Sequence, residues 1–183
     1  MLGAIVMAPA CGVQNSPQPE YFTYENIAWR LYGQRSSYDL MTNAILENLN
    51  KAIDLAPDRV CVDSYILRSQ CWLVAGEVNK AFDDWTVAIE RDPTNIHAAK
   101  AYCGRAVYYG RQKEFQKALS DINQAIILMP NYALAHAVRA IVYKDMGMYE
   151  KAKNEMVMAI GMNPNITGCF NCCEFNDAIT ARK

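Results

Sequence analysis

Small and large apolar residues recur along this chain at a fixed spacing. Four Ala-Ile pairs are each followed, four residues after the Ile, by a proline: Ala52-Ile53, Ala88-Ile89, Ala125-Ile126 and Ala159-Ile160 precede Pro57, Pro93, Pro130 and Pro164. The prolines lie 36, 37 and 34 residues apart. A period in this range is typical of stacked supersecondary units. The pattern therefore predicts four copies of one unit, which we call repeats 1 to 4.

Each repeat contains two amphipathic stretches of helical length. Three places upstream of each Ala-Ile pair alternate between large and small residues. In repeats 1 to 4 respectively they hold Trp29, Ser36 and Ile45; Tyr65, Trp72 and Ala81; Tyr102, Tyr109 and Ala118; and His136, Tyr143 and Ala152. Small residues let two helix backbones approach, and aromatic rings fill the space opposite. We expect helices over 24–34, 38–55, 60–75, 78–91, 95–110, 114–128, 133–147 and 149–162, each second helix stopping before its proline.

These places resemble the consensus of the tetratricopeptide repeat family over roughly residues 26–164. Repeat 4 matches at His136, Ala140, Tyr143, Gly147, Tyr149, Ala152, Met156, Ala159 and Pro164. Repeat 1 is the most degenerate, because Ser36 replaces an aromatic residue. The resemblance implies an all-α fold, a right-handed α-α superhelix of stacked helix-turn-helix repeats at about 24–57, 60–93, 97–130 and 131–164. Residues 21–183 would then form a single domain.

The two ends of the chain lie outside the repeats. Residues 1–20 lack the basic leading region of a secretory signal, and we interpret them as a flexible N-terminal arm. Residues 168–183 are expected to form a C-terminal capping helix, because a solenoid needs a terminal element that covers its last apolar face. Cys172, Phe175, Ala178 and Ile179 share one helical face there. A truncated fifth repeat and a disordered tail are the alternatives.

Composition narrows the functional classes. Of the 183 residues 52% are hydrophobic and 20% charged, and the net charge is −1. These values are typical of a folded domain. No cluster of Lys and Arg stands out, so we do not expect nucleic acid to be the main partner. No apolar run reaches the length of a membrane span. The seven cysteines are scattered along the chain, which favours reduced thiols over disulfides. Because thiols stay reduced in the cytosol, we expect a cytoplasmic protein.

Candidate chemical sites are few. Cys169, Cys172 and Cys173 could form a thiol or metal site, but no second pair and no nearby His completes a set of four zinc ligands. His136 takes a place that is usually aromatic, so we interpret it as a hydrogen-bonded core residue. We expect no cofactor, no metal and no enzymatic activity.

Arg68, Arg105 and Arg139 occupy the same place in three repeats. We expect each to pack its aliphatic stem and to extend its head to solvent or to a backbone carbonyl.

The resemblance also implies a concave groove lined by the first helix of each repeat. Its outward-facing places include Ile66, Gln70, Lys100, Cys103, Val107, Arg111, Leu134, Ala137, Ile141 and Lys144. Only Lys100 matches the carboxylate clamp of chaperone-binding family members, since Gly104, among others, stands where a polar or charged residue is required. We therefore predict a groove for an amphipathic helix or an apolar extended segment.

The leading hypothesis is a non-catalytic scaffold that binds a protein or peptide partner in this groove. One alternative is a self-assembling structural protein, a homodimer or a chain whose groove is filled by its own arm at 2–7. The other is the thiol or metal site at Cys169, Cys172 and Cys173.

Overall fold

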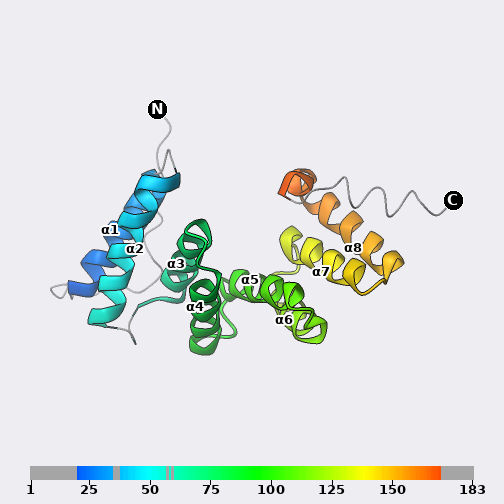
Figure 1. Cartoon of the computed structure of the whole chain (residues 1–183), viewed down its shortest axis with the longest axis horizontal. Coiled ribbons are helices and arrows are strands. Elements are labelled where there is room, and N and C mark those ends of the chain that lie inside the picture. The colour runs from blue at the N-terminus through cyan, green and yellow to red at the C-terminus, as the bar shows by residue number, and fades with distance from the viewer. Residues whose placement is uncertain (1–19, 35–37, 57, 59, 170–183) are drawn as a thin grey trace. The chain divides into compact units, whose positions relative to one another are not determined.

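A computed structural model gives the structure of the protein and describes residues 20–34, 38–56, 58 and 60–169. The helices in chain order are α1 (Glu20–Gln34), α2 (Tyr38–Leu55), α3 (Val62–Val74), α4 (Val78–Arg91), α5 (Ala98–Arg111), α6 (Phe115–Leu128), α7 (Ala133–Asp145), α8 (Tyr149–Met162) and the 3-10 helix η1 (Pro164–Cys169) (Figure 1). These ranges contain no strand. The predicted all-α helical-repeat fold is confirmed, and α2, α4 and α8 have the predicted bounds.

The chain forms two compact units with a boundary between Asp84 and Trp85, inside α4. In the N-terminal unit α1 pairs with α2, and α2 contacts α3. In the C-terminal unit α5 pairs with α6 and α7 with α8, and contacts of α7 with α5 and α6 join the two pairs. The helix-pair repeat is therefore present in both units.

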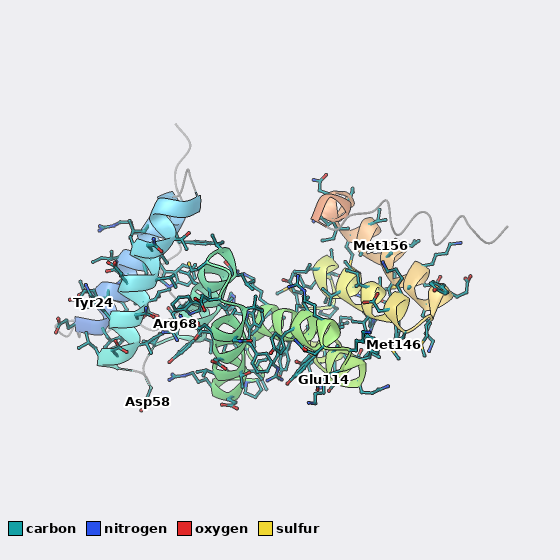
Figure 2. The ribbon with its side chains drawn as sticks, viewed as in Figure 1. Tyr24, Asp58, Arg68, Glu114, Met146 and Met156 are labelled. Carbon is teal, nitrogen blue, oxygen red and sulfur yellow. The ribbon has the colours of Figure 1, made fainter. Side chains whose placement is uncertain are left out.

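Alanines at equivalent places form the contacts between paired helices. The Ala of each Ala-Ile pair is fully buried, as are Ala81 and Ala118, so the predicted small residues lie where helices meet. In the N-terminal unit the core gathers Ala28, Ile45, Leu46, Leu49, Leu67 and Cys71. In the C-terminal unit α7, α8 and η1 share a core of Ala133, Ala137, Ala140, Ala152, Met156, Ala159 and Ile166 (Met156 is labelled in Figure 2).

The turn from first to second helix has the same geometry in repeats 2, 3 and 4. Gly76, Lys113 and Gly147 stand at equivalent places with φ of 78°, 60° and 76°. In each turn the amide of this residue donates to the carbonyl three residues back. The next amide donates to the carbonyl five residues back, as from Met148 to Tyr143 at 2.8 Å. These paired bonds satisfy carbonyls at the helix end and require a left-handed residue. Lys113 adopts that conformation without being glycine.

Both ends of the chain carry predictions that remain untested. The arm at 1–19 and the stretch 170–183 lie outside the described residues. η1 covers the first positions of the predicted cap, and Ile166 is 5% exposed against α7 and α8. Among the described helices, none has both the length and the apolar character needed to cross a membrane.

Candidate functional site

The outward face of α5 carries three of the predicted groove residues. Lys100 and Arg111 are exposed and Val107 is half-buried. These residues follow one another at spacings of seven and four, which places them along one side of the helix. Eleven residues of helix set Lys100 and Arg111 about 16 Å apart along its axis. Cys103, predicted on the same face, is only 2% exposed and cannot reach a partner.

The neighbouring helix α7 contributes a mostly apolar strip. Leu134, Ile141 and Lys144 are half-buried, and Leu134 packs in part against the core that α7 shares with α8. Ala137 is fully buried and lies in that core. α5 and α7 contact each other within the C-terminal unit. We call Lys100, Val107, Arg111, Leu134, Ile141 and Lys144 the α5–α7 surface.

The two groove residues predicted in α3 belong to the N-terminal unit. Ile66 is 5% exposed, which removes it from any binding surface. Gln70 is half-buried, and its Oε1 accepts a hydrogen bond of 3.2 Å from the Tyr32 hydroxyl. Further along the helix, Leu73 and Val74 are 44% and 47% exposed. The exposed apolar part of α3 therefore lies at its C-terminal end.

The charges on the α5–α7 surface are unevenly distributed. The sequence of α5 contains Lys100, Arg105 and Arg111 but no acidic residue. Within the described part of the chain, neither Lys100 nor Arg111 forms an ion pair. Arg105 is different, because Asp121 of α6 neutralises it. The α5 part of the surface is therefore positively charged at both ends and apolar at Val107.

Each arginine of the predicted ladder binds a carboxylate on the second helix of its own repeat, sixteen residues further on. Arg105 makes two bonds to Asp121, from Nε to Oδ2 at 2.7 Å and from Nη2 to Oδ1 at 2.9 Å. Arg68 binds Asp84 in the same way at 2.9 and 2.6 Å (Arg68 is labelled in Figure 2). The expectation that these heads reach solvent or backbone carbonyls is wrong.

The physical reason for this pairing is the burial of the carboxylates. Asp84 and Asp121 are 2% and 6% exposed, and a buried carboxylate needs a cation or several donors. Burial raises the pKa of Asp84, and the hydrogen bond from Arg68 opposes that rise. The hydrogen bond to Asp121 raises the pKa of Arg105. The guanidinium groups also lie over aromatic rings, with Arg105 Cζ 5.9 Å from the centroid of the Tyr102 ring. These arginines hold the paired helices together, so they are not available to a ligand.

His136 is part of the same arrangement in repeat 4. The side chain is 3% exposed, its Nδ1 lies 2.8 Å from Oε2 of Glu155, and its Nε2 lies 3.3 Å from the Pro130 carbonyl oxygen. Arg139 Nη2 binds Oε1 of the same carboxylate at 2.7 Å. A buried, hydrogen-bonded core histidine was predicted, and the structure confirms it.

A buried carboxylate in the N-terminal unit was not predicted. Glu25 of α1 is 1% exposed, and its Oε1 accepts bonds from the Cys61 amide at 3.3 Å, the Cys61 thiol at 2.9 Å and the Ser64 hydroxyl. Trp29 Nε1 donates to Ser64 Oγ at 3.3 Å. Cys61 and Ser64 lie 36 and 39 residues from Glu25, so no local pattern signals this cluster. The cluster joins repeat 1 to repeat 2.

The cysteines whose side chains are described are free thiols, with Cys71 and Cys103 buried and Cys61 half-buried. Burial raises the pKa of Cys103 to about 12. The side chains of Cys169, Cys172 and Cys173 lie outside the described residues. Among the side chains that are described, no group of three or more His, Cys, Asp or Glu residues could hold a metal ion.

A family model described as the tetratricopeptide repeat matches residues 133–166, which comprise α7, α8 and the start of η1. Residues 133–166 therefore match one tetratricopeptide repeat, and the similarities to known proteins support a tetratricopeptide repeat protein. The family fold is that of a protein-interaction scaffold, and its members are generally non-catalytic.

Known proteins agree with this assignment. Anaphase-promoting complex subunit 3 of Schizosaccharomyces pombe is 29% identical over 64% of this chain and 17% of that protein. The crystal structure of MamA superposes with a TM-score of 0.65 at 17% identity, covering 81% of both chains. The first tetratricopeptide repeat domain of Spaghetti (RPAP3), bound to the HSP90 peptide SRMEEVD, superposes with a TM-score of 0.55 at 25% identity, covering 66% of this chain and 91% of that one. The chain spans less than a fifth of the curated relatives it matches.

Proposed function

We propose that this tetratricopeptide repeat protein is a non-catalytic scaffold that binds a peptide segment of a partner protein on the α5–α7 surface. The observation that carries the proposal is the pair of exposed cations, Lys100 and Arg111, on either side of Val107 on one helix face. Neither cation has an acidic partner among the described residues. An exposed strip that is apolar at its centre and charged at its ends matches the usual anatomy of a protein interface.

The charges define the chemistry of the partner. Because α5 holds no acid and the Arg105 charge is neutralised by Asp121, a bound segment meets net positive charge along this helix. We therefore expect a segment with one or two apolar side chains flanked by Asp or Glu. The half-buried Leu134 and Ile141 of α7 would contact the apolar side chains.

The likeness to the Spaghetti domain supports peptide binding as the type of interaction. The peptide in that complex, SRMEEVD, combines acidic residues with Met and Val. Most of the carboxylate-clamp residues are missing here, since Gly104 and Leu67 stand at two of the clamp places. The proposed contacts therefore share Lys100 with a clamp and differ from it at Arg111.

Selection from a phage-displayed library of random peptides tests the proposal. Full-length protein should enrich peptides with an apolar centre and acidic flanks. The double variant Val107→Asp/Ile141→Asp should lose this enrichment and keep its helical circular dichroism signal. Ile127→Asp is the matched control, because Ile127 on α6 is 69% exposed and lies outside the α5–α7 surface.

A charge reversal tests the partner chemistry separately. Lys100→Glu/Arg111→Glu should shift the selected flanks from acidic to basic residues. The proposal is wrong if the protein enriches no common motif, or if the double variant selects the same peptides as the unchanged protein.

A further inference from the structure

Trp85 of α4 carries a hydrogen-bond donor that the described part of the chain does not use. The residue is 6% exposed, yet no described residue accepts a bond from its indole Nε1. Trp29 differs, because its Nε1 donates to Ser64 Oγ at 3.3 Å. A buried indole N–H usually finds a partner, since an unpaired donor costs free energy. The unused donor of Trp85 therefore indicates a place where a ligand atom can accept the bond.

This donor lies over Gly104 of α5. A Cβ atom added to Gly104 would lie 2.7 Å from Trp85 Nε1, so this edge of the ring fills the space that a side chain would take. Among the side chains that the structure describes, Arg139 Nε is the one buried nitrogen or oxygen atom that lacks a hydrogen-bond partner. Trp85 Nε1, which also lacks one, is therefore not completely covered, and a ligand atom can reach it.

Lys100 stands one helical turn before Gly104. Because four residues separate the two, they share one side of α5. The Lys100 side chain is exposed and forms no ion pair within the described ranges, and its flexible stem lets the ammonium group turn toward the ring edge. An ammonium group beside an N–H donor suits a carboxylate, because both carboxylate oxygens accept hydrogen bonds.

The first backbone amides of α5 are already used within the protein. The amides of residues 98, 99 and 100 donate to the carbonyl oxygens three residues back, at 2.9, 3.2 and 3.1 Å. Capture of a chain terminus uses backbone donors arranged as a nest, and these amides are not available for one. The two remaining donors come from side chains, which favours the side-chain carboxylate of an Asp or Glu over the carboxylate at the end of a chain.

We propose that Trp85 and Lys100 together bind one side-chain carboxylate of the partner segment, with Trp85 Nε1 donating to one oxygen and the Lys100 ammonium group to the other. This inference rests on the proposed function, because it assigns one acidic flank of the segment to a defined place. The apolar centre of the segment then contacts Val107, three residues beyond Gly104, and the second acidic flank meets Arg111. An exposed lysine alone contributes little, so the indole donor fixes where the carboxylate binds.

An array of synthetic peptides tests this site. Each peptide is acetylated and amidated and carries a central Leu between two Glu residues at varied spacings, and matched peptides carry Gln in place of either Glu. Full-length protein should bind Glu peptides more tightly than their Gln counterparts. Trp85→Phe, which keeps an aromatic ring and removes the donor, should lower the affinity for the best Glu peptide at least about tenfold. It should leave the weaker affinity for the matched Gln peptide nearly unchanged.

The indole N–H signals in a nitrogen-15 spectrum give a readout on the unchanged protein, which does not depend on the folding of a variant. The chain has three tryptophans, and the signal missing from Trp85→Phe is that of Trp85. Addition of the best Glu peptide should move this signal downfield, as a bond to a carboxylate does, and the Gln peptide should move it less. The Trp29 signal is the internal control, because Ser64 already accepts its N–H.

The outcomes separate this site from the proposed function. Binding of Glu peptides without a change in the Trp85 signal would overturn the site and leave the proposed function standing. If no peptide of the array binds, the proposed function fails and the site fails with it. A further arm uses the same peptides with free carboxyl ends. Binding that requires the free end would identify a chain terminus as the ligand, and it would also overturn the proposal.

Discussion

Trp85 packs against Gly104 so closely that no side chain fits at that position. A Cβ atom added to Gly104 would lie 2.3 Å from Cε2 of the Trp85 ring. Trp85 is 6% exposed, so its ring has little room to move. The resemblance to clamp proteins implies a cation at this place, and the Trp85 ring is the physical reason that Gly104 carries no side chain there.

Gly104→Ala should destabilise the protein. Overpacking a rigid ring costs about 1–3 kcal/mol, which outweighs the helix propensity gained by Ala, about 1 kcal/mol. Gly110→Ala on the same helix is the control, because its Cβ would lie 3.6 Å from Val142 Cγ2, an ordinary contact. Urea denaturation should therefore show opposite shifts for the two variants, and Trp85→Phe should reduce the cost of Gly104→Ala.

Removal of one member of a buried ion pair should cost more than removal of both. Arg105→Met leaves the Asp121 carboxylate, 9% exposed at its side chain, without its cation. We expect the free energy of unfolding to fall by about 2–4 kcal/mol. This loss is at or below the range for fully buried pairs, because the Arg105 side chain is 17% exposed. Arg105→Met/Asp121→Leu should recover part of it. Lys117→Ala, which breaks the exposed pair with Glu114, should leave the denaturation midpoint unchanged. Equal losses in the single and double variants would contradict this account.

Lys113→Gly should stabilise the protein. Lys113 has φ of 60° at the turn where repeats 2 and 4 carry glycine. The left-handed conformation costs a non-glycine residue about 1 kcal/mol, which glycine avoids. Gly147→Ala should lose stability by a similar amount. Thermal unfolding followed by circular dichroism compares the variants, and a lower midpoint for Lys113→Gly would refute the prediction.

Thiol reactivity should separate Cys103 from Cys61. With a pKa of about 12, the Cys103 thiol is ionised in about one molecule in ten thousand at pH 8. Iodoacetamide labelling followed by peptide mass spectrometry should modify Cys61 long before Cys103, and urea should remove the difference. Fast labelling of Cys103 in the folded protein would show that its environment opens readily.

The same raised pKa makes stability depend on pH. Above the ordinary thiol pKa of 9.0 the unfolded chain releases the Cys103 proton, whereas the folded chain keeps it until about pH 12. Because the folded state then binds more protons, stability falls as pH rises from about 9 to 12. Cys103→Ala should lose stability at pH 7 through the cavity it leaves, yet it should show a weaker decline over this alkaline range.

Periodicity alone was enough to predict the helix pairs. The bounds of α2, α4 and α8 follow from prolines, turn residues and apolar spacing, which act through the local backbone. The burial of the alanines in the Ala-Ile pairs could also be predicted, because a small residue at the same place in all four repeats indicates the same helix contact in each. The spacing of sixteen residues between arginine and acid in three repeats was a further signal, and it indicated the ion pairs that the prediction missed.

The sequence by itself determined the repeat, the helix pairs and the resemblance to the tetratricopeptide repeat family. Only the tertiary structure decided which outward places are open. Ile66, Cys103 and Ala137 occupy places that the repeat pattern assigns to the groove, yet all three are buried. Burial depends on which side chains of other helices approach each place, as the Trp85 ring approaches Gly104 and the Ser64 hydroxyl approaches Glu25. These contacts join residues far apart along the chain, and a local periodicity cannot encode them.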